Sequence, residues 1–329
     1  MASKSDLARL VKARGRAAQR GWIGCILVLI ALGCSKKEAA PGTKVELEDR
    51  PETLIYTVNY PLAYFAKRLA PGATEVVFPA PPDVDPASWK PSPEVIARYQ
   101  KADLILLNGA GYARWTQYAT LPKARTVVTA EDCRETFLPN GDAVKHQHGP
   151  DGEHAHEGTA FTTWLDMRLA LCQAERIRDA LIQLAPTRKN AVQQRFAALE
   201  RDLTRLDARL GATAKAWGDQ RILASHPVYQ YLESRYGLNG VSVHWEPGEA
   251  PGTRAMLDLR EILRSHPARL MLWEEEPLET TSEELHRFDV QSLPFRTAAN
   301  RPDDGDFFDV MEVNIARLLL KCCGTTIGP

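Results

Sequence analysis

The chain has 329 residues, of which 44% are hydrophobic and 25% are charged, with a formal net charge of -1 at pH 7. This is the composition of an ordinary globular protein that is long enough for two domains. The near-neutral charge excludes the strong basic excess that would neutralise nucleic-acid phosphates, so no nucleic-acid partner is predicted.

The N-terminus has the pattern of an export signal. An apolar run over residues 22–32 is about half the ~20 residues that a membrane-spanning helix needs, which favours the core of a signal peptide. An uncleaved anchor or a wrongly assigned start is the alternative. The basic residues that precede the run are Lys4, Arg9, Lys12, Arg14, Arg16 and Arg20.

The apolar run ends in a small residue followed by a cysteine, Gly33-Cys34, which resembles a bacterial lipobox; Cys25 is a weaker alternative. We therefore predict a signal peptide over residues 1–33 and lipid attachment at Cys34, which would hold the mature protein at a membrane. Residues 34–51 are polar with Pro and Gly, as expected of a flexible tether.

From residue 53 onward, apolar strand patterns alternate with helix signals. Pro61 opens one predicted helix, and Ser92-Pro93 is a helix start with serine as the cap. This alternation predicts βα units with a parallel sheet, in an N-terminal lobe over residues 52–165. The predicted strands of this lobe are residues 53–59, 75–78, 103–108 and 125–130.

The middle of the chain, residues 166–217, is predicted to be helical. Apolar residues recur there at steps of three and four, which predicts one helix of roughly 30 residues, about 45 Å long. A helix of that length suits a spine that joins two lobes, with an ordinary packed helix as the alternative. The apolar positions are Val192, Phe196, Leu199, Leu203, Leu206 and Leu210.

The alternation resumes in a C-terminal lobe over residues 218–329, with strands predicted at 221–225, 241–245 and 270–273 and a last helix at 307–320. The predicted fold class is therefore α/β, with two open parallel-sheet (βα) lobes joined by one long rigid helix. Such lobes bind ligand in the crevice between them, at the carboxyl ends of their strands.

The cysteines outside the leader are predicted to be incidental. No Cys-x-x-Cys spacing occurs, so neither a disulfide framework nor a zinc knuckle is indicated. These cysteines are Cys133, Cys172, Cys322 and Cys323.

The predicted N-terminal lobe contains a histidine-rich loop over residues 146–156. Four of the eight histidines, His146, His148, His154 and His156, fall within residues 146–157, mixed with acids and glycines. Imidazole suits zinc, copper and nickel, so the segment is predicted to collect metal. A solvated loop without function is the alternative.

Further candidate ligands follow predicted strands. His226 comes directly after one strand, His244 and Glu246 share one face of the next by the period of two, and Glu274 follows the third. Imidazoles and carboxylates converging on one crevice would make a site for zinc, with manganese as an alternative. Alternatively, His226 is a packing residue, and the glutamates, including Glu249, are solvated loop residues.

Together these residues resemble the periplasmic metal-binding proteins of zinc and manganese ABC importers, the ZnuA/TroA-like family, across nearly the whole mature chain. The resemblance implies the same two lobes and long helix. The matching segments are Tyr60-Pro61-Leu62, residues 81–86, residues 101–112, Thr163-Trp164-Leu165-Asp166, Ser225-His226, Glu246-Pro247-Gly248-Glu249 and the helix at the C-terminus.

The resemblance also implies three histidines and one carboxylate as metal ligands, and here the chain departs from the family. Those positions would fall at Ala87, Thr162 and His226 and near Ser292, so one of the four keeps a strong ligand. Ligation has then moved to the histidine-rich segment, His244 and the nearby acids, or the solute has changed.

The predicted function is that of a zinc-binding lipoprotein that delivers metal to an ABC permease and catalyses no reaction. It is expected to be a monomer, held by lipid in the periplasm or at the outer face of the cell membrane, with His154 or His156 folding over the crevice. The alternatives are the same fold binding another or a chelated metal, an envelope hydrolase that uses Glu246 or Glu274 as a base on metal-bound water, and an adhesin or assembly factor.

Overall fold

The computed structural model describes residues 53–140, 146–147, 153–154 and 158–322. All of them belong to one compact unit, Asp49–Pro329. The predicted signal peptide, Cys34 and the predicted tether lie outside the described residues, as do His148 and His156.

The first lobe is built on a four-stranded parallel sheet in the order β2-β1-β3-β4. Its strands are β1 (Thr53–Thr57), β2 (Thr74–Val77), β3 (Leu104–Leu107) and β4 (Thr126–Val128).

Two helices of this lobe begin at side-chain caps. The side-chain oxygen of Asn59 accepts a hydrogen bond from the backbone N–H of Leu62 at the start of α2 (Tyr60–Leu69). Ser92 caps α3 (Pro93–Lys101) as its sequence predicts. Each cap satisfies an N–H group that a helix start would otherwise leave without a partner.

The second lobe repeats the arrangement, with strand order β10-β9-β7-β8 and all neighbours parallel. Its strands are β7 (Arg221–Ala224), β8 (Asn239–Ser242), β9 (Leu270–Trp273) and β10 (Gln291–Pro294). Its helices are α6 (Gln230–Tyr236), α7 (Thr253–Ser265) and α8 (Glu279–His286).

Three longer helices complete the unit: α4 (Met167–Leu184), α5 (Lys189–Trp217) and α9 (Phe307–Cys322). β5 (His146–Gln147) and β6 (Glu153–His154) form a small antiparallel pair. Short 3-10 turns lie at Arg114–Gln117, Lys123–Arg125, Glu131–Thr136, Thr163–Leu165 and Pro186–Arg188.

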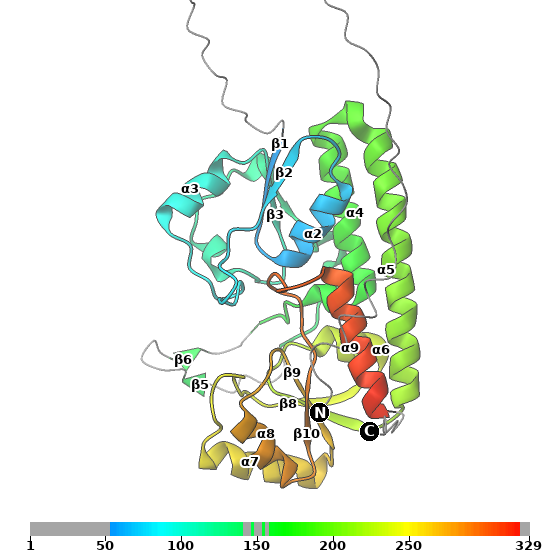
Figure 1. Ribbon diagram of the computed structural model, residues 1–329. Helices are drawn as coiled ribbons and strands as arrows, with labels where there is room; N and C mark the ends of the chain where they lie inside the picture. Colours follow the sequence, from blue (N-terminus) through cyan, green and yellow to red (C-terminus); the bar gives the residue numbers. More distant parts are fainter. Residues whose placement is uncertain (1–52, 141–145, 148–152, 155–157, 323–329) are drawn as a thin grey trace, which may run out of the picture. The chain divides into compact units, whose positions relative to one another are not determined.

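The helix α5 has the predicted length. It has 29 residues, or about 44 Å at the usual rise per residue, and its predicted apolar stripe is buried. It contacts α2 and α4 on the side of the first sheet and α6 on the side of the second, and α9 packs along it (Figure 1). The predicted fold class, two parallel α/β lobes joined by one long helix, is confirmed.

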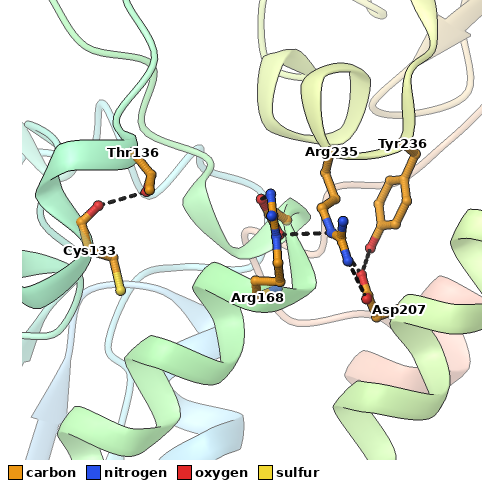
Figure 2. A network of polar contacts seen from close by, with 7 residues as sticks. Cys133, Thr136, Arg168, Asp207, Arg235 and Tyr236 are labelled. Carbon is orange, nitrogen blue, oxygen red and sulfur yellow. Dashed lines mark hydrogen bonds and ion pairs between the residues drawn. The ribbon is translucent and has the colours of Figure 1, made fainter.

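A polar network reinforces this connection (Figure 2). Arg235 of α6 donates two hydrogen bonds to the carboxylate of Asp207 on α5, at 3.1 and 2.5 Å, and Tyr236 donates a third at 2.9 Å. The same guanidinium lies 3.5 Å from Asp166, which caps α4. Bidentate pairing of this kind fixes geometry better than an isolated surface ion pair.

Asn108 holds the carboxyl end of the first sheet in place. Its side-chain oxygen accepts hydrogen bonds from Asn59, at 3.1 Å, and Gln173, at 2.9 Å, and its amide donates to the Phe161 carbonyl at 2.9 Å. Both Asn108 and Gln173 are fully buried. Because breaking a buried network leaves polar groups without partners, this one fixes the segment that leads into α4.

The segment Phe295–Arg301, which we call the crossover segment, joins the end of β10 to the first lobe. The Phe295 N–H donates to the Trp273 carbonyl at 2.7 Å. The Thr297 carbonyl accepts from the Trp164 indole at 2.7 Å, and the Ala299 carbonyl accepts from Tyr60 N–H at 3.0 Å. The crossover segment is therefore bonded to both lobes.

Two details of the predicted second lobe are wrong. β8 ends at Ser242 instead of spanning residues 241–245, so His244 and Glu246 follow the strand. The expected alternation nevertheless persists, because Val243 and Trp245 are buried and still donate to the carbonyls of Ala224 and Ser225. β10 was not predicted as a strand.

The prediction that the cysteines are incidental is also wrong. Cys133, in a 3-10 turn, forms a disulfide with Cys172 on α4, with their Cα atoms 6.7 Å apart. The two are 39 residues apart in sequence, and no local pattern shows that α4 packs beside this turn. Cys322 donates to the Ala216 carbonyl instead. No helix in the described part of the chain combines the length and apolar character needed to cross a bilayer.

We expect the Cys133→Ala/Cys172→Ala double variant to lose about 2–4 kcal/mol of unfolding free energy, because a cross-link over this separation restricts the unfolded chain. The measurement is chemical denaturation without reductant. Cys322→Ser is the matched control and should stay near wild type. Equal midpoints for all three proteins would show that the cross-link does not stabilise the fold.

Candidate functional site

A cavity of about 470 Å³ opens between the carboxyl ends of the two sheets. The first lobe contributes residues 82–86, Tyr112, Phe161 and Thr162. The second contributes His226, Val228, Glu246, Pro247, Glu274 and Glu275, and the chain from Arg296 to Asp303 completes the wall together with Val310. This is the crevice that the fold class predicts.

His226 is the imidazole of this cavity. It follows β7 and the buried Ser225, and its side chain is 19% exposed. Its Nε2 lies 3.8 Å from Glu246 Oε1, and its Nδ1 lies 3.7 Å from Glu274 Oε1. The His244 ring stands nearly perpendicular to it, with centroids 5.8 Å apart. Each ring nitrogen of His226 thus faces one carboxylate.

Glu274 follows β9 directly and carries a strongly perturbed carboxyl group. Burial raises its pKa to about 8, and the neighbouring carboxylates of Asp85, Glu246 and Glu275 add to the increase. Part of its side-chain surface, 30%, still faces the cavity. Because ionising it would add a negative charge beside three others, the Glu274 carboxyl group holds its proton near neutral pH.

Besides His226, the family resemblance implies metal ligands at three more positions. In the structure, the polar groups of these three residues bond to other parts of the protein. Ala87 is buried and its N–H donates to Asp85 Oδ1 at 2.9 Å. The Thr162 hydroxyl donates to the Val228 carbonyl at 2.6 Å, across the two lobes. Ser292 lies on β10 and accepts from the Ser282 hydroxyl at 3.0 Å.

The structure thus brings His226, Glu246 and Glu274 together, and His244 lies beside them. Glu249 instead lies exposed in the turn after Glu246. In the described part of the chain, no three His, Cys, Asp or Glu side chains already stand as a coordination group. The backbones of His146 and His154 pair in the β5–β6 ladder. The predictions for the histidine-rich segment otherwise lie outside the described residues.

Sequence reasoning missed several polar residues of the cavity, and three of them bear on its chemistry. Asp85 and Tyr112 belong to loops of the first lobe, and Arg296 belongs to the crossover segment. The rule that ligand groups follow strands would have found Arg296 had β10 been recognised. Asp85 and Tyr112 carry no comparable signal, because their loops reach the cavity only through the tertiary fold.

These features define a class. Two parallel α/β lobes, a long connecting helix and a polar crevice at the strand ends describe a two-lobed solute-binding protein. The chain matches the sequence model of the family described as ZnuA, zinc-uptake complex component A, periplasmic, over residues 55–319, and it belongs to this family. The family predicted from the sequence is confirmed.

Several curated relatives are similar over most of this chain. The zinc-binding lipoprotein AdcA of Streptococcus pneumoniae is 25% identical over 305 residues, which are 89% of this chain and 58% of AdcA. This chain thus spans little more than half of that relative. The zinc uptake protein ZnuA of Bacillus subtilis is 24% identical, over 76% of this chain and 78% of its own. The manganese-binding lipoprotein PsaA of Streptococcus pneumoniae is 24% identical, over 87% and 92%.

Solved structures share the fold. Zn(II)-bound AdcA from Streptococcus pneumoniae superposes with a TM-score of 0.70 at 20% identity, over 81% of this chain and 57% of that one. The metal-dependent lipoprotein YcdH from Bacillus subtilis gives 0.67 at 20% identity, over 82% and 98%.

The raised pKa of Glu274 predicts how zinc binding will depend on pH. A carboxylic acid must lose its proton before it binds a cation, and its ionised form accepts an imidazole N–H more strongly, so affinity should rise with pH until the pKa of about 8 is passed. Between pH 7.0 and 8.5 the ionised fraction grows roughly eightfold, and the apparent Zn²⁺ affinity should grow with it.

The measurement is Zn²⁺ titration against a competing chelator at the two pH values. Glu274→Gln should bind more weakly and lose this increase. Glu276→Gln, whose side chain is 66% exposed and pairs with Arg317, is the control and should behave like wild type. An increase that survives in Glu274→Gln would assign the titration to another group.

Proposed function

We propose that this protein is a metal-binding component of an ABC importer that receives zinc in the crevice and delivers it to a permease, without catalysing a reaction. The observation that carries the proposal is His226, which faces Glu246 and Glu274 at the strand ends of a chain from a zinc-uptake family. Manganese is the alternative cargo, since two relatives are named for it.

The arrangement around His226 suggests a division of roles. Two ligands of a tetrahedral zinc ion lie about 3.3 Å apart when each is about 2 Å from the metal. His226 Nε2 and Glu246 Oε1, now 3.8 Å apart, need only a small rotation to share an ion. Glu274, on the Nδ1 side, is then placed to accept the N–H that orients the ring.

The histidine-rich segment would supply further ligands in this proposal. His154 or His156 would fold over the crevice in place of the imidazoles that Ala87 and Thr162 do not provide. His146 and His148 would collect metal in the same segment, and His244 would stand beside His226. The segment comes shortly before Phe161 and Thr162 in sequence, and these two residues line the cavity.

Export and lipid attachment complete the proposal. Cleavage before Cys34 would leave an acylated cysteine at the end of the tether, as the lipoprotein relatives suggest. The Cys133–Cys172 disulfide supports a location outside the cytoplasm, because disulfides persist in oxidising compartments. The proposed unit is a monomer anchored in the periplasm or at the outer face of the cell membrane.

Replacing His226 with Ala should weaken Zn²⁺ binding by at least two orders of magnitude, since a bond of about 2.0–2.1 Å to the metal is lost. The fold should stay intact because the side chain lies at the cavity edge. Calorimetric titration is the measurement, with circular dichroism as the check on folding. His286→Ala, an exposed histidine on α8, is the matched control. Unchanged affinity in a folded His226→Ala protein would remove the crevice from the metal site.

Deleting residues 146–156 tests the segment. If its imidazoles replace the two that are missing from the crevice, tight Zn²⁺ binding should be lost altogether. A collecting role alone would lower the number of bound ions and leave one tight site, which contradicts the proposal. Metal content and affinity are measured on protein purified without a histidine tag.

A further inference from the structure

The cavity is larger than a bare ion requires. Its volume of about 470 Å³ lies in the range of sites that hold small organic molecules, about 300–1,000 Å³. A zinc ion with four donor atoms at about 2 Å fills a small part of such a space. The remaining wall is therefore available for contacts to something other than the metal.

Arg296 is a cation built into that wall. Its backbone is held on both sides by Asn314, which is 1% exposed: Asn314 Oδ1 accepts the Arg296 N–H at 3.0 Å, and Asn314 Nδ2 donates to the Arg296 carbonyl at 2.8 Å. The backbone position from which this side chain enters the wall is therefore fixed by α9.

The guanidinium of Arg296 has donor capacity to spare. Its Nη2 lies 3.4 Å from Glu275 Oε2, longer than the roughly 2.7–2.9 Å of a strong charge-assisted hydrogen bond. Its Nε is buried and has no hydrogen-bond partner among the described residues. A buried N–H donor without a partner costs free energy. The side chain is 35% exposed, so a small shift would let an anionic oxygen in the cavity recover that cost.

Tyr112 gives a second, independent observation at the same cavity. It is 5% exposed and lines the same cavity, and its buried hydroxyl has no partner in the described part of the chain. The ring is fixed by edge contacts to Phe161 and Trp164, with centroids 5.5 and 5.4 Å away. The hydroxyl therefore cannot swing freely to find a partner elsewhere, and a cargo atom would satisfy it.

The charges of the cavity suit a cargo with two ends. His226, Glu246 and Glu274 form a side that attracts a cation. The wall also carries two guanidinium groups, Arg296 and Arg301, among the carboxylates of Asp83, Asp85, Glu275 and Asp303, so it offers contacts to groups of both signs. We propose that the crevice takes its metal as a complex with a small anionic chelator, whose carboxylate or similar oxygen is bound by Arg296 and Tyr112. This inference rests on the proposed metal-binding function and names the form in which the metal arrives.

The test uses labelled citrate and labelled nitrilotriacetate as chelators, each alone and as a preformed 1:1 zinc complex, in equilibrium dialysis with the intact protein. Zn²⁺ alone is titrated in parallel. We expect retention of at least one chelator in a 1:1:1 complex with zinc and protein, with at least tenfold weaker retention of the chelator alone. Arg296→Gln should weaken retention of the complex by about tenfold or more, and by a larger factor than any change in its affinity for Zn²⁺ alone.

Arg317→Gln is the matched control, because Arg317 pairs with Glu276 and donates to the Pro294 carbonyl outside the cavity wall. It should retain the complex like wild type. A protein that strips zinc from both chelators and retains neither would overturn this inference while the proposed zinc function stands. A protein that binds no zinc in any form would overturn both. Retention of a chelator equally well without zinc, or undiminished in Arg296→Gln, would also contradict the inference.

Discussion

The crossover segment is the constraint on which both the assembly of the lobes and the site depend. Over seven residues it bonds to Trp273 of the second sheet, to Trp164 before α4 and to Tyr60 at the start of α2. Asn300 at its end donates to the Pro81 and Val84 carbonyls, at 2.6 and 2.9 Å, and so positions the loop that carries Asp85. One strip of chain therefore sets the distance across the crevice and also supplies part of its wall.

The geometry of this segment explains why a change in it would reach the site. Ala298 adopts a left-handed backbone, with φ of 57°, which costs a non-glycine residue about 1 kcal/mol or more and persists where the surroundings impose it. The flanking hydrogen bonds of Thr297 and Ala299 impose it here. Arg296 precedes this bend, so its direction into the cavity follows from the same backbone path.

The sequence allowed most of the fold to be predicted because its apolar runs are short and clearly bounded. The run at β9, Leu270–Trp273, is fully buried and read plainly as a strand. β10 could not be recognised, because in Gln291–Pro294 the one fully buried side chain is Leu293 and the strand ends in proline. The stripe of α5 was predictable from its period, whereas the partner of Cys133 depends on how α4 packs and leaves no trace in local sequence.

The residues of the site were likewise predictable only in part. His226 and Glu274 were predictable because each follows an apolar strand at once, and the carboxyl ends of parallel strands meet at one edge. Asp85, Tyr112 and Arg296 were not, because they reach the cavity from loops or from the unrecognised strand β10. Their charges change the interpretation of the site: the sequence shows a set of metal ligands with gaps, and the structure shows a cavity whose wall contains guanidinium groups as well as carboxylates.

The two lobes contribute unequally to the cavity, and this bears on what completes the coordination of the cargo. The first lobe offers Asp85 and Tyr112, because Ala87 has no donor atom and the Thr162 hydroxyl is spent on the Val228 carbonyl. That hydrogen bond links the lobes without any metal. An ion held by His226 and Glu246 of the second lobe then has coordination positions left to fill. Either imidazoles of the histidine-rich segment or oxygens of a chelator can fill them, and a chelator would in addition satisfy Arg296 and Tyr112, which no imidazole does.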